Sequence, residues 1–148
     1  MSRALVVVTS DFSPESERAF PTAVSLAAAM DAELRLVHAV AEIEPIATKE
    51  LHAPTAESDP NVPKLRARLR ALEAKLAGAP MVSSHVLASA DVDAAITNYA
   101  KEQGAAFLVV ASHGRGGIRR LVMGSVAERL LRTSKVPVVI VPIGNQAP

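Results

Sequence analysis

Apolar residues gather in five short runs along the chain, and longer stretches with helical periodicity separate them. The runs are ALVVV (4–8), LRLVHAV (34–40), SSHVLA (83–88), AFLVV (106–110) and VPVVIV (136–141). The first, fourth and fifth runs are continuously apolar, which is typical of strands that are buried on both faces of a parallel sheet. The pattern therefore predicts five strands.

Two helices are predicted between the first three runs. Ser13-Pro14-Glu15 offers an N-cap, a proline at the first helical position and an early acid, so it predicts a helix start. Pro21 falls inside this helix, where a proline removes one hydrogen bond and kinks the axis. A leucine stripe over 65–76 predicts the second helix, and Gly78 marks its end.

Two more helices are predicted after the third and fourth runs. An apolar stripe over 92–100 predicts one of them, with Asp91 as its N-cap and Gly104 as its stop. The last helix opens with Ser125-Val126-Ala127-Glu128, which is a capping-box pattern. Its periodicity indicates a buried face made of Val126, Ala127, Leu130 and Leu131.

Strands and helices thus alternate from one end of the sequence to the other. This order calls for right-handed crossovers and predicts an α/β fold, an open five-stranded parallel sheet with helices on both faces. The stretch 41–62 is a long connection. The sequence has no internal repeat and no visible domain boundary, so we expect a single domain over residues 1–148.

Composition narrows the classes of function. Lys and Arg number 16 against 15 Asp and Glu, and this near-neutral balance gives no reason to expect a partner in nucleic acid or an anionic membrane. The chain has no cysteine, which excludes disulfides and thiolate chemistry, and its histidines lack metal-ligand spacing, so no metal site is expected. The apolar run near the N-terminus is too short for a signal peptide or a membrane span, so a cytoplasmic protein is expected.

The candidate site lies where the predicted strands end, because open α/β sheets bind ligands beyond the carboxyl ends of their strands. Three segments fall there: Thr9-Ser10-Asp11, Ala39-Val40 and the stretch 111–117. Gly124-Ser125 then leads into a helix N-terminus, whose free N–H groups and partial positive charge suit a phosphate. With Asp11 as an acceptor for ribose hydroxyls and three arginines nearby, these parts predict a nucleotide pocket. The arginines are Arg115, Arg119 and Arg120.

Other interpretations of the same residues stay open. The stretch has neither the Gly-Lys-Ser/Thr of a Walker A loop nor the third glycine of the dinucleotide fingerprint. The glycines at 114, 116 and 117 can serve a turn, Asp11 can cap the first helix, and Ser125 can be an N-cap alone. His38 is interpreted as a hydrogen-bonded structural histidine, and no nucleophile or paired acid accompanies His113 as a catalytic base. The basic stretch KLRARLRALEAK (64–75) is interpreted as a solvated helix face.

Three stretches together resemble one known family. LVVASHGRGGIRRLVMGSVAERLLRTSKVPVVIVP (108–142), with VVVTSDFSPESERAF (6–20) and LRLVHAV, is similar to the universal stress proteins of the nucleotide-binding α/β class. The ATP-binding branch of that family carries Gly-x-x-Gly, nine residues and Gly-Ser/Thr. Gly114, the nine residues 115–123 and Gly124-Ser125 match this motif, whereas Ala111 replaces its first glycine.

The resemblance implies a Rossmann-like sheet of order 3-2-1-4-5 and a homodimer formed through the last strand, residues 136–142. It also implies that ATP, with or without Mg²⁺, is bound by Asp11 at the ribose, by Thr9 and Ser10 at the floor and by the Ala39 backbone at the adenine edge. Near the phosphates it places Gly114, Arg115, Gly124, Ser125 and Val126, and a side chain at Gly124 would take the space of a phosphate oxygen. Ala111 and His113 complete the candidate binding set.

The function expected from this resemblance is that of an ATP-binding regulatory module in a stress response. The alternative is a stress protein that has lost nucleotide binding and acts through protein–protein interaction, which Ala111 favours. An enzyme is not expected beyond slow ATP hydrolysis, because the sequence shows no catalytic base and no Walker motif.

Overall fold

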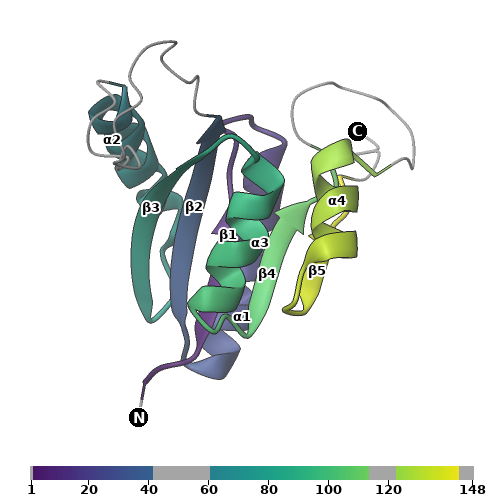
Figure 1. Ribbon diagram of the computed structural model, residues 1–148. Helices are drawn as coiled ribbons and strands as arrows, with labels where there is room; N and C mark the ends of the chain where they lie inside the picture. The colour runs from purple at the N-terminus through teal and green to yellow at the C-terminus, as the bar shows by residue number, and fades with distance from the viewer. Residues whose placement is uncertain (1, 42–60, 114–122, 144–148) are drawn as a thin grey trace, which may run out of the picture.

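A computed structural model of the chain describes residues 2–41, 61–113 and 123–143. These residues form a five-stranded sheet of order β3-β2-β1-β4-β5, in which every neighbouring pair is parallel (Figure 1). The predicted fold class and strand order are therefore confirmed, whereas a single domain over 1–148 stays a prediction. The strands are β1 Leu5–Thr9, β2 Glu33–Ala41, β3 Met81–Ser89, β4 Phe107–Ala111 and β5 Val138–Val141.

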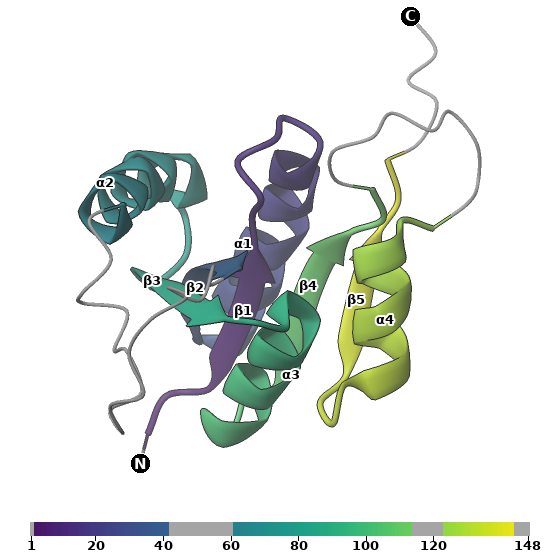
Figure 2. The same ribbon diagram turned by 45° about the horizontal axis from the view of Figure 1, so that its top comes forward.

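Helices cover both faces of the sheet, as the alternation of elements predicts. Figures 1 and 2 show α3 (Val92–Glu102) and α4 (Ser125–Thr133) in front of the sheet, with α1 (Phe20–Met30) behind it. The helix α2 (Val62–Glu73) packs behind β3, through Leu69, on the same side as α1. Short 3₁₀ segments, Ser16–Ala19 and Ala74–Leu76, precede α1 and follow α2.

The core consists of two apolar clusters that the central strands separate. Along β1, Val6 and Val8 face the cluster under α1 and α2, while Leu5 and Val7 face the cluster under α3 and α4. This alternation follows from the two-residue period of a strand. Because β1 and β4 bury side chains on both faces of the sheet, consecutive positions along these two strands are apolar. Both strands lie in the middle of the sheet and have a helix layer on each side.

The outer strand β5 differs from its prediction. Its apolar run predicts burial on both faces, but every residue from Val138 to Val141 is only half-buried. The physical reason is position: β5 is the last strand of the sheet and pairs with β4 on one side only within the described residues.

The start of α1 also differs from its prediction. Ser13 acts as a cap, since its Oγ accepts a hydrogen bond from the N–H of Ser16 at 3.2 Å. The α-helix, however, begins at Phe20, so Pro21 is its second residue and not an interior one. The predicted interior kink is wrong, because the first turn of a helix has no intrahelical acceptor for the missing N–H.

The start of α4 corrects a third prediction. Gly124 is the N-cap, its carbonyl accepts the N–H of Glu128 at 3.0 Å, and Ser125 is the first helical residue. Ser125 makes no capping hydrogen bond, so the capping-box interpretation is wrong. Ala127 and Leu130 are buried as expected, whereas Val126 and Leu131 are 47% and 49% exposed.

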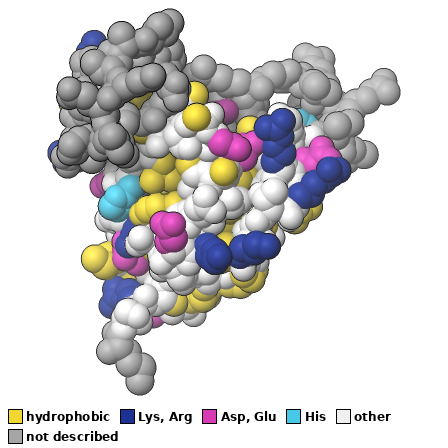
Figure 3. Space-filling view, in the orientation of Figure 1, with side chains coloured by type: hydrophobic (Ala, Val, Ile, Leu, Met, Phe, Trp, Pro, Cys, Tyr) yellow, Lys and Arg dark blue, Asp and Glu magenta, His cyan; other side chains and the backbone are white. Residues whose placement is uncertain are grey.

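The outer surface of α3 and α4 carries charges of both signs. Figure 3 shows Lys and Arg side chains interspersed with Asp and Glu over this face. Arg129 on α4 pairs with Asp93 on α3 at 3.1 Å, and Arg132 pairs with Glu128 at 2.7 Å. The first pair links the two helices, but the exposure of both arginines limits such pairs to about 0–1 kcal/mol.

Candidate functional site

A cavity of about 260 Å³ lies at the carboxyl ends of β1, β2 and β4, beside the N-terminus of α4. This is the end of the sheet at which open α/β folds bind ligands, next to the point where the strand order reverses. Every predicted site residue that the structure describes lines this one cavity. These residues are Thr9, Ser10, Asp11, Ala39, Ala111, His113, Gly124, Ser125 and Val126.

Two predicted residues, Gly114 and Arg115, lie outside the described residues, as do Arg119 and Arg120. The sequence interpretation also missed part of the wall. Apolar side chains of β2, β4, α3 and α4 line the cavity together with Ser16, His38 and Ser112. The apolar residues are Val37, Val92, Ile96, Val110 and Ala127.

The loop between β1 and α1 holds Asp11 in a local hydrogen-bond pattern. Oδ1 of Asp11 accepts the N–H of Ser13 at 2.9 Å and also the hydroxyl of Ser13. Asp11 therefore caps the entry to the helix, which was its alternative role, and it lines the cavity at the same time. The two roles are compatible because a carboxylate has two oxygens and several acceptor positions.

His38 has the structural bond that was expected of it. Its Nδ1 lies 2.8 Å from the carbonyl oxygen of Ser10, to which the ring N–H donates. Ser10 is further tied to β2, because its N–H donates to the carbonyl of Val37 at 3.0 Å. His38 also lines the cavity, so this structural histidine is part of the site.

Gly124 and Ser112 bring two backbone segments together at the other end of the cavity. The N–H of Gly124 donates to the carbonyl of Ser112 at 2.6 Å, and a Cβ on Gly124 would lie only 3.0 Å from that same oxygen. Ser112 is itself fixed by β5, since its N–H donates to the carbonyl of Val141 at 2.8 Å. This close approach is a second reason for the absence of a side chain at Gly124, and the expectation that the space belongs to a phosphate stays a prediction.

His113 carries the single buried side-chain polar atom without a partner in the part of the chain that the structure describes. Its Nδ1 lies 3.0 Å from the hydroxyl oxygen of Ser112, while Nε2 is shielded from solvent and makes no hydrogen bond. A buried donor or acceptor without a partner costs about 1–3 kcal/mol. Such atoms are rare in native structures, and this residue borders the candidate cavity.

Ala111, which stands where the family motif has a glycine, ends β4. Its side chain packs against the apolar cluster on the α1 side of the sheet, although the residue also borders the cavity. Val110, its neighbour, belongs to the cluster on the α3 side. The extra methyl group of Ala111 is thus accommodated by the core.

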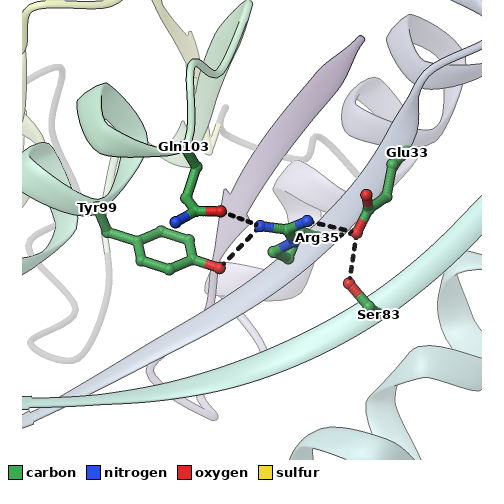
Figure 4. A network of polar contacts seen from close by, with 5 residues as sticks. All are labelled: Glu33, Arg35, Ser83, Tyr99 and Gln103. Atoms are coloured by element: carbon green, nitrogen blue, oxygen red, sulfur yellow. Dashed lines mark hydrogen bonds and ion pairs between the residues drawn. The ribbon is translucent and has the colours of Figure 1, made fainter. Parts of the chain in front are cut away.

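A second group of polar side chains lies outside the cavity, and its members are hydrogen-bonded to one another. Arg35 on β2 donates to Glu33 at 2.8 and 3.0 Å, and also to Tyr99 and Gln103 at the end of α3, while Ser83 on β3 donates to Glu33 at 2.8 Å (Figure 4). Burial disfavours the Glu33 carboxylate, but the hydrogen bonds from Ser83 and Arg35 and the charge of Arg35 outweigh it, so the pKa of Glu33 lies below its ordinary value. Because none of these residues lines the cavity, the network serves the fold.

Side-chain clusters that could hold a metal ion and membrane-spanning helices are both absent from the residues that the structure describes. Within 2–41, 61–113 and 123–143, no three or more His, Asp or Glu side chains come together in a group that could hold a metal ion. The helices in these ranges also lack the combination of length and apolar character that a membrane-spanning helix needs.

Comparison with known proteins identifies relatives. The model of the "Universal stress protein family" matches residues 1–142. A universal stress protein of Mycobacterium tuberculosis is 31% identical over 137 residues, which are 93% of this chain and 45% of that protein. The chain thus spans about half the length of the mycobacterial relatives it matches. Universal stress protein YxiE of Bacillus subtilis is 29% identical over 144 residues, covering 92% of this chain and 97% of that protein.

Solved structures give a consistent picture. A crystal structure of a universal stress protein in complex with cAMP has a TM-score of 0.69 and 29% sequence identity. The match covers 96% of this chain and 98% of the other. The similarity therefore extends over nearly the whole of both chains.

Proposed function

Because the chain belongs to the universal stress protein family, we propose that it is a regulatory module that holds ATP in the cavity at the carboxyl ends of β1, β2 and β4. Binding of ATP in the cavity would change the interaction with a partner protein, or the dimer state, during a stress response. The observation that carries this proposal is the convergence of the predicted site residues, which are far apart in sequence, on one cavity. A cytoplasmic location stays a prediction.

The phosphate end of the proposed site is the N-terminus of α4. Gly124 caps this helix, and the first N–H groups of α4 have no acceptor within the helix. These groups and the helix dipole favour an anion. Ser125 and Val126, the first two helical residues, both border the cavity, so their N–H groups support phosphate binding there.

The nucleoside end of the proposed site lies between β1 and β2. Asp11 would accept hydrogen bonds from ribose hydroxyls, and the backbone of Ala39 would pair with the adenine edge. Apolar residues border the cavity, and Val92, which is only partly buried, offers a contact for a flat base. The cAMP complex of the relative that is 29% identical supports an adenine nucleotide as the ligand.

Any magnesium ion would enter with the triphosphate. Asp11 is the single carboxylate among the described residues that line the cavity, and Mg²⁺ is commonly bound by one or two carboxylates together with substrate phosphates. We therefore propose no separate magnesium site. We also propose no enzymatic role beyond slow hydrolysis, because no described nucleophile in the cavity lies against a general base with a paired acid.

A homodimer through residues 136–142 is part of the proposal. β5 lies at the edge of the sheet and its four residues are half-buried, although all of them are apolar. An uncovered apolar edge strand is a pairing liability, and pairing with a second copy across a two-fold axis would cover it.

The first test is calorimetric titration of ATP into the wild type and the Asp11→Asn variant. The asparagine side chain keeps an oxygen for the N–H of Ser13 but loses the charge, so the loop is preserved while the ribose bond weakens. Loss of a hydrogen bond to a charged group predicts affinity lower by about 10- to 150-fold. Asp91→Asn is the matched control, because Asp91 caps α3 without lining the cavity itself and asparagine caps equally well.

The Ala111→Gly variant separates this proposal from its alternative. It restores the motif glycine, so ATP affinity should stay the same or rise. If the wild type fails to bind millimolar ATP and Ala111→Gly binds it, the chain is an interaction protein that has lost nucleotide binding. If neither binds, the nucleotide proposal fails.

A further inference from the structure

The aromatic ring of Phe12 contacts two side chains from distant parts of the chain. The imidazole of His38 on β2 lies with its ring centroid 4.3 Å from that of Phe12 and is tilted by 44° against it. The guanidinium carbon of Arg68 on α2 lies over the Phe12 ring, 4.1 Å from its centre. The stack Arg68–Phe12–His38 therefore joins α2, the β1–α1 loop and β2. Of these three residues, only His38 lines the cavity.

Phe12 holds an uncommon backbone conformation. Its φ is +67°, in the left-handed region that a bulky residue rarely adopts. The N–H of Phe12 donates to the hydroxyl of Ser10 at 3.0 Å, and the two flanking side chains hold its ring. Strained residues of this kind persist where the surroundings over-determine them, and they cluster at binding sites. Here the turn at Phe12 immediately follows Asp11, which borders the cavity.

We infer that Phe12 and Arg68 are positioning residues for the nucleotide site, with Arg68 acting from outside the cavity. By stacking on Phe12, Arg68 holds the turn that sets the Asp11 carboxylate and holds the His38 ring against the wall. This inference rests on the proposed function, and it adds α2 to the parts of the fold that determine affinity. Arg68 belongs to the basic stretch 64–75, which the sequence interpretation assigned to solvent.

The inference predicts that a substitution at Arg68 changes nucleotide affinity although Arg68 does not line the cavity. Loss of an exposed cation–π contact corresponds to about a two- to five-fold change in an equilibrium constant, so Arg68→Met should weaken ATP binding by this factor. Arg70→Met is the matched control. It removes the same charge from the same helix, but Arg70 lies about 200° around the helix axis from Arg68 and should leave affinity unchanged.

Titration of both adenosine and ATP distinguishes a positioning role of Arg68 from a long-range effect of its charge on the phosphates. Because the stack acts on the loop of Asp11 and on His38 at the nucleoside end, Arg68→Met should weaken adenosine and ATP by the same factor. A loss for ATP alone would show that Arg68 attracts the phosphates through its charge, and would overturn the inference. Equal affinities for wild type and Arg68→Met would overturn it as well.

A measurement without ligand keeps this inference separate from the proposed function. In the amide and imidazole NMR spectra of the free protein, Arg68→Met should shift the resonances of residues 10–13 and of His38, while Arg70→Met should not. Unchanged resonances in Arg68→Met would overturn the positioning role even if ATP binds. Shifted resonances in a protein that binds neither ATP nor adenosine would support the positioning of the loop and refute the nucleotide proposal.

Discussion

Gly124 lies where two backbone segments come within hydrogen-bonding distance, and this contact disfavours a side chain there. A methyl group there would approach the carbonyl oxygen of Ser112 to 3.0 Å and the Cα of His113 to 3.4 Å. Both neighbours are backbone atoms, which cannot turn aside as a flexible side chain can. We expect Gly124→Ala to destabilise the fold by about 1–3 kcal/mol, the usual range for overpacking.

The measurement for Gly124→Ala is urea denaturation with ATP titration of the folded fraction. The matched control is Gly104→Ala, where φ is +66° but the space around a Cβ is open, so any cost there comes from the backbone alone. If Gly124→Ala keeps wild-type stability and loses ATP, the phosphate and not the contact with Ser112 explains this glycine.

The hydroxyl group of Ser112 determines which nitrogen of the neutral His113 ring carries the hydrogen. The Ser112 hydroxyl oxygen accepts the N–H of Ile143 at 2.9 Å, so its own hydrogen is available to Nδ1 of His113 at 3.0 Å. Nδ1 is then an acceptor and Nε2 carries the hydrogen of the neutral ring, which leaves Nε2 unable to take a proton as a base. A nitrogen–proton correlation spectrum of the imidazoles should show the Nε2–H tautomer for His113, and Ser112→Ala should shift it toward a mixture. An Nδ1–H signal in the wild type would contradict this.

The residues of the site were predictable to the extent that strand ends identify them. Thr9, Asp11 and Ala39 lie at the ends of apolar runs and Gly124 precedes a helix, so periodicity alone places them at one end of the sheet. The apolar wall was not predictable, because Val37 and Ile96 have the same pattern as ordinary core residues. Arg68 was also missed, since a cation on a helix gives no sign that an aromatic ring from another loop will lie beneath it.

At the scale of elements, the entry to α1 changes what Pro21 is expected to do. As an interior residue it would cost about 3 kcal/mol, but as the second residue of α1 it lies where helices tolerate proline. We expect Pro21→Ala to change the free energy of unfolding by less than about 0.5 kcal/mol. Ala28→Pro, at an exposed interior position of the same helix, is the control and should cost about 3 kcal/mol or more. A large gain from Pro21→Ala in thermal denaturation would show that the proline strains the helix.

Arg35 on β2 links the end of α3 to the sheet. Its guanidinium group donates hydrogen bonds to side chains at the end of α3 and to Glu33 on β2, which also accepts a hydrogen bond from Ser83 on β3. The side chains of Arg35 and Glu33 are only 15% and 18% exposed, so removing the cation leaves a carboxylate with poor solvation. We expect Arg35→Met to destabilise the protein by about 1–3 kcal/mol at pH 7 in urea denaturation. The pair between Arg129 and Asp93 is the control, because Arg129 is 70% exposed and Arg129→Met should cost less than about 1 kcal/mol.

The pH dependence of Arg35→Met follows from the direction of the Glu33 shift. The pKa of Glu33 is lowered in the folded protein, so its contribution to stability is present above its ordinary value of 4.5 and is lost as the pH falls through the folded value. The difference between wild type and Arg35→Met should therefore shrink on acidification below about pH 4.5. A difference that stays constant from about pH 7 to about pH 3 would show that Glu33 is not the partner that matters.

At the scale of the whole molecule, the pattern of apolar runs predicts the sheet but does not show which strand lies at its edge. The alternation of strands and helices fixes a parallel sheet with two helix layers, whereas the order of the strands came from the family resemblance. A continuous apolar run looks the same in a central strand and in an edge strand that a second copy covers. For this reason β5 was expected to be buried on both faces, although its residues are half-buried in the single chain.

Within the described residues, β5 has one unpaired edge, and its geometry specifies which backbone groups a second copy would use. The carbonyls of Pro137 and Val141 accept hydrogen bonds from the N–H groups of Leu108 and Ser112, so the odd-numbered residues of β5 face β4. In a parallel pair the bonding side alternates along the strand, and the N–H of Ile140 therefore faces away from β4, toward the edge.

Ile140→Pro removes this donor while leaving the bonds to β4, and prolines are tolerated on the outward side of edge strands. We expect this variant to be monomeric, with only the modest loss of stability that comes from replacing a half-buried side chain. Val139→Pro, whose N–H faces β4, should instead destabilise the fold itself. Light scattering and thermal denaturation distinguish the two variants. A wild type that is monomeric at micromolar concentration, or an Ile140→Pro variant that remains dimeric, would show that the chain does not pair through β5.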